Sequence, residues 1–402
     1  MRDLFTVEKG CWYVGTDAAA LENRTVAAYT MKYDGGKFAD IVLNGDSHCY
    51  SEDTEILTEY GWKRFGDLDV TDKVAQWDNG KISFVLPSHI VWQDYEGEMI
   101  HFKSGAVDML VTPNHRVCYT TYRNPKVRVK LAKDIPENNS SIRIPVSGET
   151  LEAGLSLSDS EVKFLVAVQA DGYLYKDDYR MEFCFVKDRK IARMTDLLDT
   201  LGYYYYVNTF YRKGREEVKF RIRDSEARRL VDTYLDGKKF STKFLKMNLG
   251  QAKVFIEELA HWDGTYRNNA TIWDTTCLQS RDIAAAVATL AGYKPKINSY
   301  AAYGNTGKNG RHRLYINMHD KGEVGLLAAS KTIVPYKGKI GCVSVPSSFV
   351  VVRRNDRIIV SGNTLNVFAF FPHVAKQFDI NEKGLKDRPD FKPYRDKAKT
   401  GA

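Results

Sequence analysis

Residues able to do chemistry stand at two widely separated points of this 402-residue chain. Cys49 carries a thiol, an activatable nucleophile that can attack the carbonyl of His48 and convert an amide into a thioester. Much later in the chain, the side-chain amide of Asn363 can attack its own carbonyl and cleave the backbone as a succinimide, and the hydroxyl of Thr364 can accept an acyl group. Together these groups could open two peptide bonds and join the outer pieces.

An acid–base motif lies between these two points. The sequence Thr112-Pro113-Asn114-His115 supplies an imidazole that titrates near neutral pH and can protonate a departing nitrogen. The Thr112 hydroxyl can hydrogen-bond the same peptide. Each signal alone is weak, because a cysteine before a strand is usually core and a T-x-x-H is usually a turn. Their order around an inserted segment makes the combination specific.

The elements that must position these residues change class twice. Residues 49–150 show short alternating segments broken by Gly, Asp, Asn and Pro, which is typical of strands, and residues 331–363 return to that pattern. Residues 158–330 mix helical and strand-like patterns. A single fold rarely changes class and changes back, so we expect an all-β domain interrupted by an α/β (α+β) insertion, with 1–48 and 364–402 as flanks.

The insertion contains an internal duplication. One helical pattern ends at Asp171-Gly172 and a second ends at Asp263-Gly264, each followed by strand-like and helical runs. This repetition predicts two helix–strand–strand–helix (αββα) units. Apolar and basic residues alternate in EEVKFRIRD, so one face of that strand can pack on helices while the other meets phosphates. The basic residues that we expect to contact DNA are Lys219, Arg221, Arg223, Arg311 and Arg313.

The ends of the β domain resemble an intein with a Hint-type splicing domain. The resemblance rests on Cys49 with TEILTEYGW, on the motif that ends at His115, and on the terminal VVVRRNDRIIVSGNT. It implies a horseshoe-shaped all-β domain that splices itself without a cofactor. Cys49, Asn363 and Thr364 would be the reacting residues, with Thr112 and His115 as helpers.

This sequence departs from the intein pattern near Asn363. Gly362 stands where a histidine is usual, and Pro346-Ser347-Ser348 stands in a strand that usually carries another histidine. Cys342 replaces a common aspartate, a variant that resembles some phage inteins. Our hypothesis is that Cys342, or ordered water, assists the cyclisation of Asn363.

The insertion resembles the LAGLIDADG homing endonucleases. FLVAVQADG and IEELAHWDG match the two motif helices of that family. The resemblance implies that Asp171 and Asp263 hold Mg²⁺ at the centre of a double-stranded DNA site and that the metal activates water. Three interpretations stay open: a splicing protein with an active endonuclease, a splicing protein with an inactive DNA-binding insert, and a DNA-binding protein that does not splice.

The flanks resemble pieces of bacteriophage-type family A DNA polymerases. VGTDAAALENR is similar to the palm strand, in which Asp17 would be the metal-binding carboxylate, and RDKAKT is similar to the start of the fingers helix. Arg395 and Lys399 lie four positions apart, so both lie on one helix face, where they could grip a triphosphate. We expect this fragment to be too short to polymerise DNA alone, and another chain could supply the rest.

Composition excludes several classes of protein. The chain has 43% hydrophobic and 27% charged residues and no apolar run of about 18 residues, so we expect no membrane span. None of the six cysteines forms a C-x-x-C pair, which argues against zinc and disulfide scaffolds. The net charge of +8 permits nucleic-acid binding. We expect a monomer in the cytoplasm of a phage-infected or bacterial cell.

Overall fold

The computed structural model describes residues 49–362 except for 138–141, 177, 213, 302–309, 320–321 and 327–329. Five of the predicted site residues lie outside the described residues, namely Asn363, Thr364, Asp17, Arg395 and Lys399. Within the described part of the chain, no helix is long and apolar enough to cross a membrane.

The β part of the chain is built from strands on both sides of the insertion. Before the insertion come β1 (Tyr50–Ser51), β2 (Glu55–Thr58), β3 (Gly61–Arg64), β4 (Val74–Asp78), β5 (Lys81–Val85), β6 (His89–Lys103), β7 (Asp108–Val111), β8 (Arg116–Thr121), β9 (Asn124–Leu131), β10 (Ile142–Pro145) and β11 (Glu149–Thr150). After it come β22 (Glu323–Gly325), β23 (Ser330–Ser344), β24 (Phe349–Arg354) and β25 (Arg357–Gly362).

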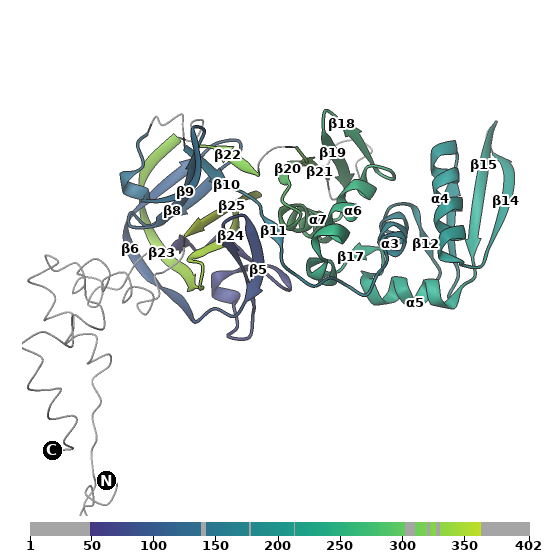
Figure 1. Cartoon of the computed structure of the whole chain (residues 1–402), viewed down its shortest axis with the longest axis horizontal. Helices are drawn as coiled ribbons and strands as arrows, with labels where there is room; N and C mark the ends of the chain where they lie inside the picture. The colour runs from purple at the N-terminus through teal and green to yellow at the C-terminus, as the bar shows by residue number, and fades with distance from the viewer. Residues whose placement is uncertain are drawn as a thin grey trace, which may run out of the picture. The chain divides into compact units, whose positions relative to one another are not determined.

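Strands from these two blocks pair with one another in all three described sheets of the β part. β23 runs antiparallel to β6 along its whole length, as Figure 1 shows, and the two form a closed barrel with β1 and β7. β24 pairs with β2 in a second sheet, and β22 pairs with β10 in a third. Segments that are far apart in the sequence therefore build one β structure.

The insertion leaves and re-enters this structure at adjacent points. Pro145 of β10 lies opposite Glu323 of β22, and the Val146 N–H donates to the Gly322 carbonyl at 2.8 Å. An insertion whose two ends meet across neighbouring strands disturbs the host sheets little. Because β22 pairs with β10, the second β block begins at Glu323, earlier than the boundary at 331 that the sequence pattern gives.

The insertion consists of two similar α/β units. Its elements are α3 (Asp159–Asp171), β12 (Tyr173–Leu174), β13 (Met181–Phe185), α4 (Asp188–Leu201), β14 (Tyr205–Arg212), β15 (Arg215–Ile222), α5 (Ser225–Tyr234), β16 (Leu235–Asp236), β17 (Lys239–Phe240), α6 (Leu249–Leu259), β18 (Gly264–Arg267), β19 (Ala270–Thr275), α7 (Leu278–Leu290), β20 (Lys294–Tyr300) and β21 (Arg311–Asn317). The two sheets have the same order, β12-β13-β15-β14 and β18-β19-β21-β20.

The predicted αββα repeat is wrong in one respect, because each unit continues into two further strands. The sequence is helix, two strands, helix, two strands in both copies. In the first copy β14 is the added edge strand, and most of its side chains are exposed. A strand that buries neither face needs no alternation of apolar and polar residues, so periodicity gives no signal for it.

Helices α3 and α6 begin alike but end differently. α3 ends at Asp171, whereas α6 ends at Leu259, so the helix that the sequence pattern extends to Asp263 stops one turn earlier. A capping box starts each one, with Ser158 and Glu161 at α3 and Asn248 and Gln251 at α6. A glycine follows each motif aspartate because there is no space for a Cβ. A Cβ added at Gly172 would lie 2.7 Å from the Val168 carbonyl oxygen, and one at Gly264 would lie 2.7 Å from the Leu259 carbonyl oxygen.

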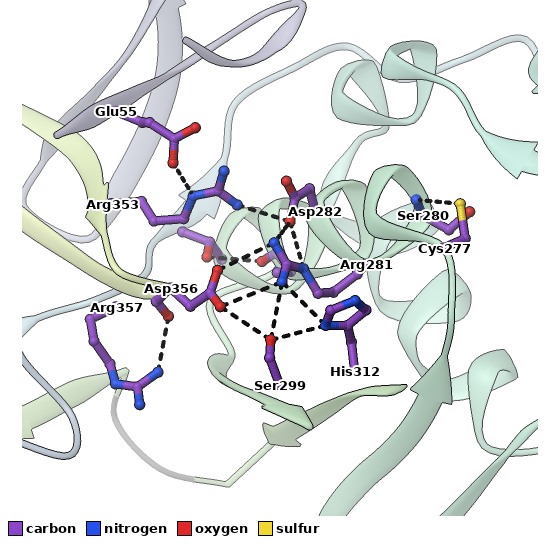
Figure 2. A network of polar contacts seen from close by, with 12 residues as sticks. Glu55, Cys277, Ser280, Arg281, Asp282, Ser299, His312, Arg353, Asp356 and Arg357 are labelled. Carbon is purple, nitrogen blue, oxygen red and sulfur yellow. Dashed lines mark hydrogen bonds and ion pairs between the residues drawn. The ribbon is translucent and has the colours of Figure 1, made fainter. Parts of the chain in front are cut away.

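Two buried arginines join the insertion to the β part (Figure 2). Arg281 of α7 contacts the carboxylates of Asp282 and Asp356, with N–O distances of 2.6 and 3.2 Å. Arg353 of β24 contacts Asp282 at 2.9 Å and Glu55 at 2.7 Å. Because both guanidinium groups are largely shielded from water, their charges depend on these carboxylates.

Removing Arg281 should destabilise this joint, because Asp282 and Asp356 would lose a compensating cation. We expect Arg281→Ala to lower the free energy of unfolding by about 2 kcal/mol in urea denaturation. The control is Arg229→Ala on α5, whose exposed contact with Glu226 at 3.8 Å should contribute less than about 0.5 kcal/mol. Equal effects of the two substitutions would contradict a stabilising joint.

These measurements need a chain that stays intact. Cys49→Ala and Asn363→Ala together remove both predicted cleavage reactions, and we call the chain carrying them the blocked chain. All stability comparisons are made between variants of the blocked chain, so that one covalent species unfolds.

Candidate catalytic sites

Cys49 is fully buried, and one residue holds both of its backbone groups. The Cys49 N–H donates to Thr112 Oγ1 at 3.1 Å, and the Thr112 N–H donates to the Cys49 carbonyl at 3.1 Å. The next residue, Tyr50, lies opposite Val111 of β7 and Gly341 of β23. The peptide nitrogen that would leave in thioester formation therefore lies against a hydroxyl.

The turn from Thr112 to His115 brings the imidazole into the same buried region. The His115 N–H donates to the Thr112 carbonyl at 3.0 Å and closes the turn, and the Ala132 N–H donates to the His115 carbonyl at 2.8 Å. The imidazole Nε2 lies 2.8 Å from Ser361 Oγ. Because Ser361 belongs to β25, His115 contacts the strand that leads to Asn363.

Tyr50 connects the beginning of the β part to its end. Its hydroxyl donates to the Gly362 carbonyl at 2.6 Å, across 312 positions of sequence. Its ring stacks on Phe65 with a centroid distance of 5.3 Å and meets the His115 ring edge-on at 4.5 Å. Spacing in the sequence gives no signal for Tyr50 or Ser361, and only their contacts reveal them as part of this site.

Cys342 lies beside the predicted nucleophile. Its Sγ is 3.2 Å from the Sγ of Cys49, and the Cys49 thiol donates to it. This distance is far from the roughly 2.05 Å of a disulfide bond, so the two sulfurs are neighbouring thiols. Both side chains are fully buried. The contact links Cys342 to the first predicted step, and its assistance to Asn363 stays a prediction.

Gly362 stands where no larger residue fits. A Cβ added there would overlap the Arg116 carbonyl oxygen and lie 2.7 Å from the Arg116 Cβ. The backbone of β8 therefore approaches β25 too closely for a histidine at this position. Glycine at this position therefore has a steric cause.

A second candidate site contains Asp171, the last residue of α3, and Asp263, which lies in the turn after α6. These two helices pack against each other. Lys190 of α4 contacts the Asp171 carboxylate, and its Nζ lies 3.8 Å from Asp263 Oδ1. Burial, together with the negative charge of Asp171, raises the pKa of the Asp263 carboxyl. Burial lowers the pKa of Lys238, which also faces both carboxylates.

The two carboxylates fit a divalent cation. No group of three or more His, Cys, Asp or Glu side chains able to hold a metal occurs among the described residues. Mg²⁺ is commonly held by one or two carboxylates, with water and substrate phosphates as its other ligands. Asp171 and Asp263 supply that number of carboxylates, and their mutual repulsion is the kind that a bound cation relieves.

On each of the two sheets of the insertion, basic side chains surround one carboxylate. In the first sheet, Lys219 Nζ and Arg221 Nε donate to the Glu182 carboxylate at 3.0 and 2.8 Å. In the second sheet, Arg313 donates twice to Asp274 at 2.9 and 3.0 Å. In both copies the carboxylate lies directly opposite an arginine of the neighbouring strand, Glu182 opposite Arg221 and Asp274 opposite Arg313.

Of the two remaining predicted basic residues, Arg311 lies near such a pair and Arg223 follows the end of β15. Arg311 Nε is 3.9 Å from Asp274, and the Arg223 N–H donates to the Tyr204 carbonyl at 3.0 Å just beyond β15. Val218, Phe220 and Ile222 are buried on the opposite face, as the alternating pattern predicts. Glu182 and Asp274, on neighbouring strands of the same sheets, therefore compensate part of the positive charge of these basic residues.

Glu258 of α6 has a structural partner. Its buried carboxylate accepts hydrogen bonds from Arg193 of α4 and from the Trp262 indole, the latter at 2.7 Å. The structure accommodates this carboxylate by pairing its charge.

Comparisons with known proteins give distant relatives. No protein-family model matches the sequence. The ribonucleoside-diphosphate reductase subunit beta of Aquifex aeolicus is 26% identical over 365 residues, covering 80% of this chain and 51% of that protein. The chain thus spans about half the length of this curated relative.

Two kinds of solved structure resemble parts of the chain. A splicing-inactive variant of the class 3 split intein AceL NrdHF covers 80% of this chain and 100% of its own length, with 11% identity and a TM-score of 0.33. The homing endonuclease I-DmoI in complex with DNA and Mn covers 40% of this chain and 92% of its own length, with 14% identity and a TM-score of 0.31. Because these TM-scores are low, the function has to be argued from the geometry of the sites.

The packing around Gly362 gives a testable expectation. In the blocked chain, Gly362→Ala should lower the free energy of unfolding by about 2 kcal/mol, because the new Cβ overlaps the Arg116 backbone. The matched control is Gly325→Ala in β22, where a Cβ would meet no atom within 4 Å. Urea denaturation measures both, and a Gly362→Ala chain as stable as the Gly325→Ala chain would contradict the steric explanation.

Proposed function

We propose that residues 49–363 excise themselves from the chain and join the two flanks. One observation carries this proposal: the buried contacts of Tyr50 and His115 hold the residues that follow Cys49 next to the residues that precede Asn363. Two distant peptide bonds can be exchanged only if both junctions lie at one site. Strands that merely formed a binding domain would need no such meeting of nucleophile, imidazole and chain end.

The first step would be an acyl shift at Cys49. The thiol proton leaves, Sγ bonds to the carbonyl carbon of His48, the C–N bond breaks and the Cys49 nitrogen takes up a proton. The hydrogen bond from the Cys49 N–H to Thr112 holds this peptide in place, and Cys342 Sγ accepts the hydrogen bond of the Cys49 thiol. His115 is the proton donor that we assign to the leaving nitrogen.

The later steps would pass the acyl group across the site. The Thr364 hydroxyl attacks the thioester and releases the Cys49 thiol. The Asn363 side-chain amide then attacks its own carbonyl and frees the Thr364 amine, which takes the acyl group in a native peptide bond. Both residues lie outside the described residues, and their assignment rests on their chemistry and on the position of Gly362 next to them.

Splicing and its dependence on His115 can be measured directly. Mass spectrometry of the expressed chain should find the excised segment and the ligated flanks. His115→Ala should slow the first cleavage at least 100-fold, because general acid catalysis typically contributes that much. The matched control, His89→Ala, removes an exposed histidine at the start of β6 and should leave the rate unchanged. An intact parent chain after prolonged incubation would contradict the proposal.

We also propose that the insertion cleaves double-stranded DNA. Support comes from the two carboxylates that meet where α3 and α6 lie together, and from the basic outer faces of both sheets. Asp171 and Asp263 would hold Mg²⁺, which would activate a water molecule for attack on a phosphate. Lys190 and Lys238 would balance the charge of the carboxylates before the metal enters.

An inactive, DNA-binding insert is the second candidate. Lys190 already contacts both carboxylates, and Glu182 and Asp274 compensate the basic residues of the outer faces. A site in which a lysine permanently replaced the metal could still bind DNA without cutting it. The two candidates differ in whether a divalent cation displaces Lys190.

A nicking assay separates these candidates. The blocked chain with Mg²⁺ should cut a DNA fragment that contains the uninterrupted junction of the two coding flanks. Asp171→Asn should reduce cutting at least 1,000-fold, on the order of other losses of a catalytic metal site, while binding in EDTA persists. Asp196→Asn, which changes an exposed carboxylate on α4, is the control. Binding without any cutting by the blocked chain would favour the inactive insert.

For the host protein we propose a family A DNA polymerase. This proposal rests on the sequence of the flanks alone, in which Asp17, Arg395 and Lys399 match catalytic segments of that family. Splicing would join these segments. Polymerisation would require the remainder of the polymerase.

A further inference from the structure

We propose that Tyr50 is a positioning residue for the second cleavage, the cyclisation of Asn363. This inference rests on the proposed function and adds a residue to it. Tyr50 follows the nucleophile directly, yet its hydroxyl donates to the carbonyl of Gly362 at 2.6 Å. That carbonyl belongs to the peptide bond between Gly362 and Asn363. The hydrogen bond therefore holds the peptide plane from which Asn363 extends.

The Tyr50 ring has little freedom to move. It is 1% exposed, stacks on Phe65 with an interplanar angle of 12°, and meets His115 edge-on at 4.5 Å. The Tyr50 backbone is held by β7 and β23. A hydroxyl carried on a fixed ring can orient an acceptor at small entropic cost, because few torsions remain to be ordered.

The acceptor is equally constrained. Gly362 lies opposite Phe349 in the pairing of β24 with β25, and the Arg116 backbone leaves no space for a Cβ at this position. With the Gly362 carbonyl anchored, only the torsions of Asn363 itself remain to be set for attack of its side-chain nitrogen. Restricting the other torsions raises the fraction of molecules in a reactive geometry.

The donor also stays a donor. Burial raises the pKa of Tyr50 well above its ordinary value, so the phenol remains protonated over the whole neutral range. The sequence lacks the usual histidines near Asn363. The Tyr50 phenol, which stays protonated, compensates in part for their absence by orienting the peptide between Gly362 and Asn363. The printed sequence places Gly362 directly before Asn363, so the effect of Tyr50 passes through the Gly362 carbonyl.

The test is Tyr50→Phe, which removes one oxygen and keeps the ring. The two cleavages are measured separately: thiol-induced cleavage before residue 49 in an Asn363→Ala chain, and release of residues 364–402 in a Cys49→Ala chain. We expect release of the C-terminal piece to slow at least tenfold, equivalent to about 1.4 kcal/mol. Thiol-induced cleavage should change less than twofold.

The control is Tyr205→Phe in β14 of the insertion, which removes a hydroxyl that donates to Asp199 Oδ1 at 2.7 Å, away from the junctions. It should leave both rates unchanged. If Tyr50→Phe slows both cleavages by the same factor, Tyr50 is structural and the inference is wrong. If it slows neither, the inference is also wrong. A parent chain that performs neither cleavage overturns the proposed function itself, which separates the two failures.

Discussion

The structure depends on one constraint: the chain on either side of the insertion must pair as if it were continuous. The antiparallel pairing of β23 with β6 runs through 15 residue pairs. The pairing of β1 with β23, in which Tyr50 lies opposite Gly341, places Cys342 next to Cys49. The hydroxyl of Tyr50 and the imidazole of His115 then reach β25. Each of these contacts joins a residue that precedes the insertion to one that follows it. Buried backbone groups must find partners, so the paired strands tolerate little displacement of either junction.

The insertion respects that constraint because its two ends meet. The hydrogen bond between Val146 and Gly322 closes its base, and the joint made by Arg281 and Arg353 fixes it against β24 and the turn before β25. Asp356 in that turn adopts a positive φ of 62°, so the turn has a defined shape that the arginine of α7 contacts. The same buried charges that attach the insertion thus also hold the turn from which the last strand starts.

The two candidate sites use burial in opposite ways. Around Cys49, burial keeps Tyr50 neutral and leaves a compact set of hydrogen bonds with defined geometry. Around Asp263, burial and the negative charge of Asp171 raise the pKa of the carboxyl, and Lys190 partly opposes this. The second site has a charge arrangement that a divalent cation would balance.

The sequence by itself determines which chemical groups are available. Cys49, the motif ending at His115, and the two Asp-Gly pairs can be found because their types are distinctive and their spacing is local or repeated. The edge strand β14 cannot, because an exposed strand carries no two-residue period. Tyr50 and Ser361 cannot either. Their roles come from contacts across 312 and 246 positions, and hydrogen bonds act only over about 3 Å. Only the tertiary structure decides which strands, and therefore which groups, come that close.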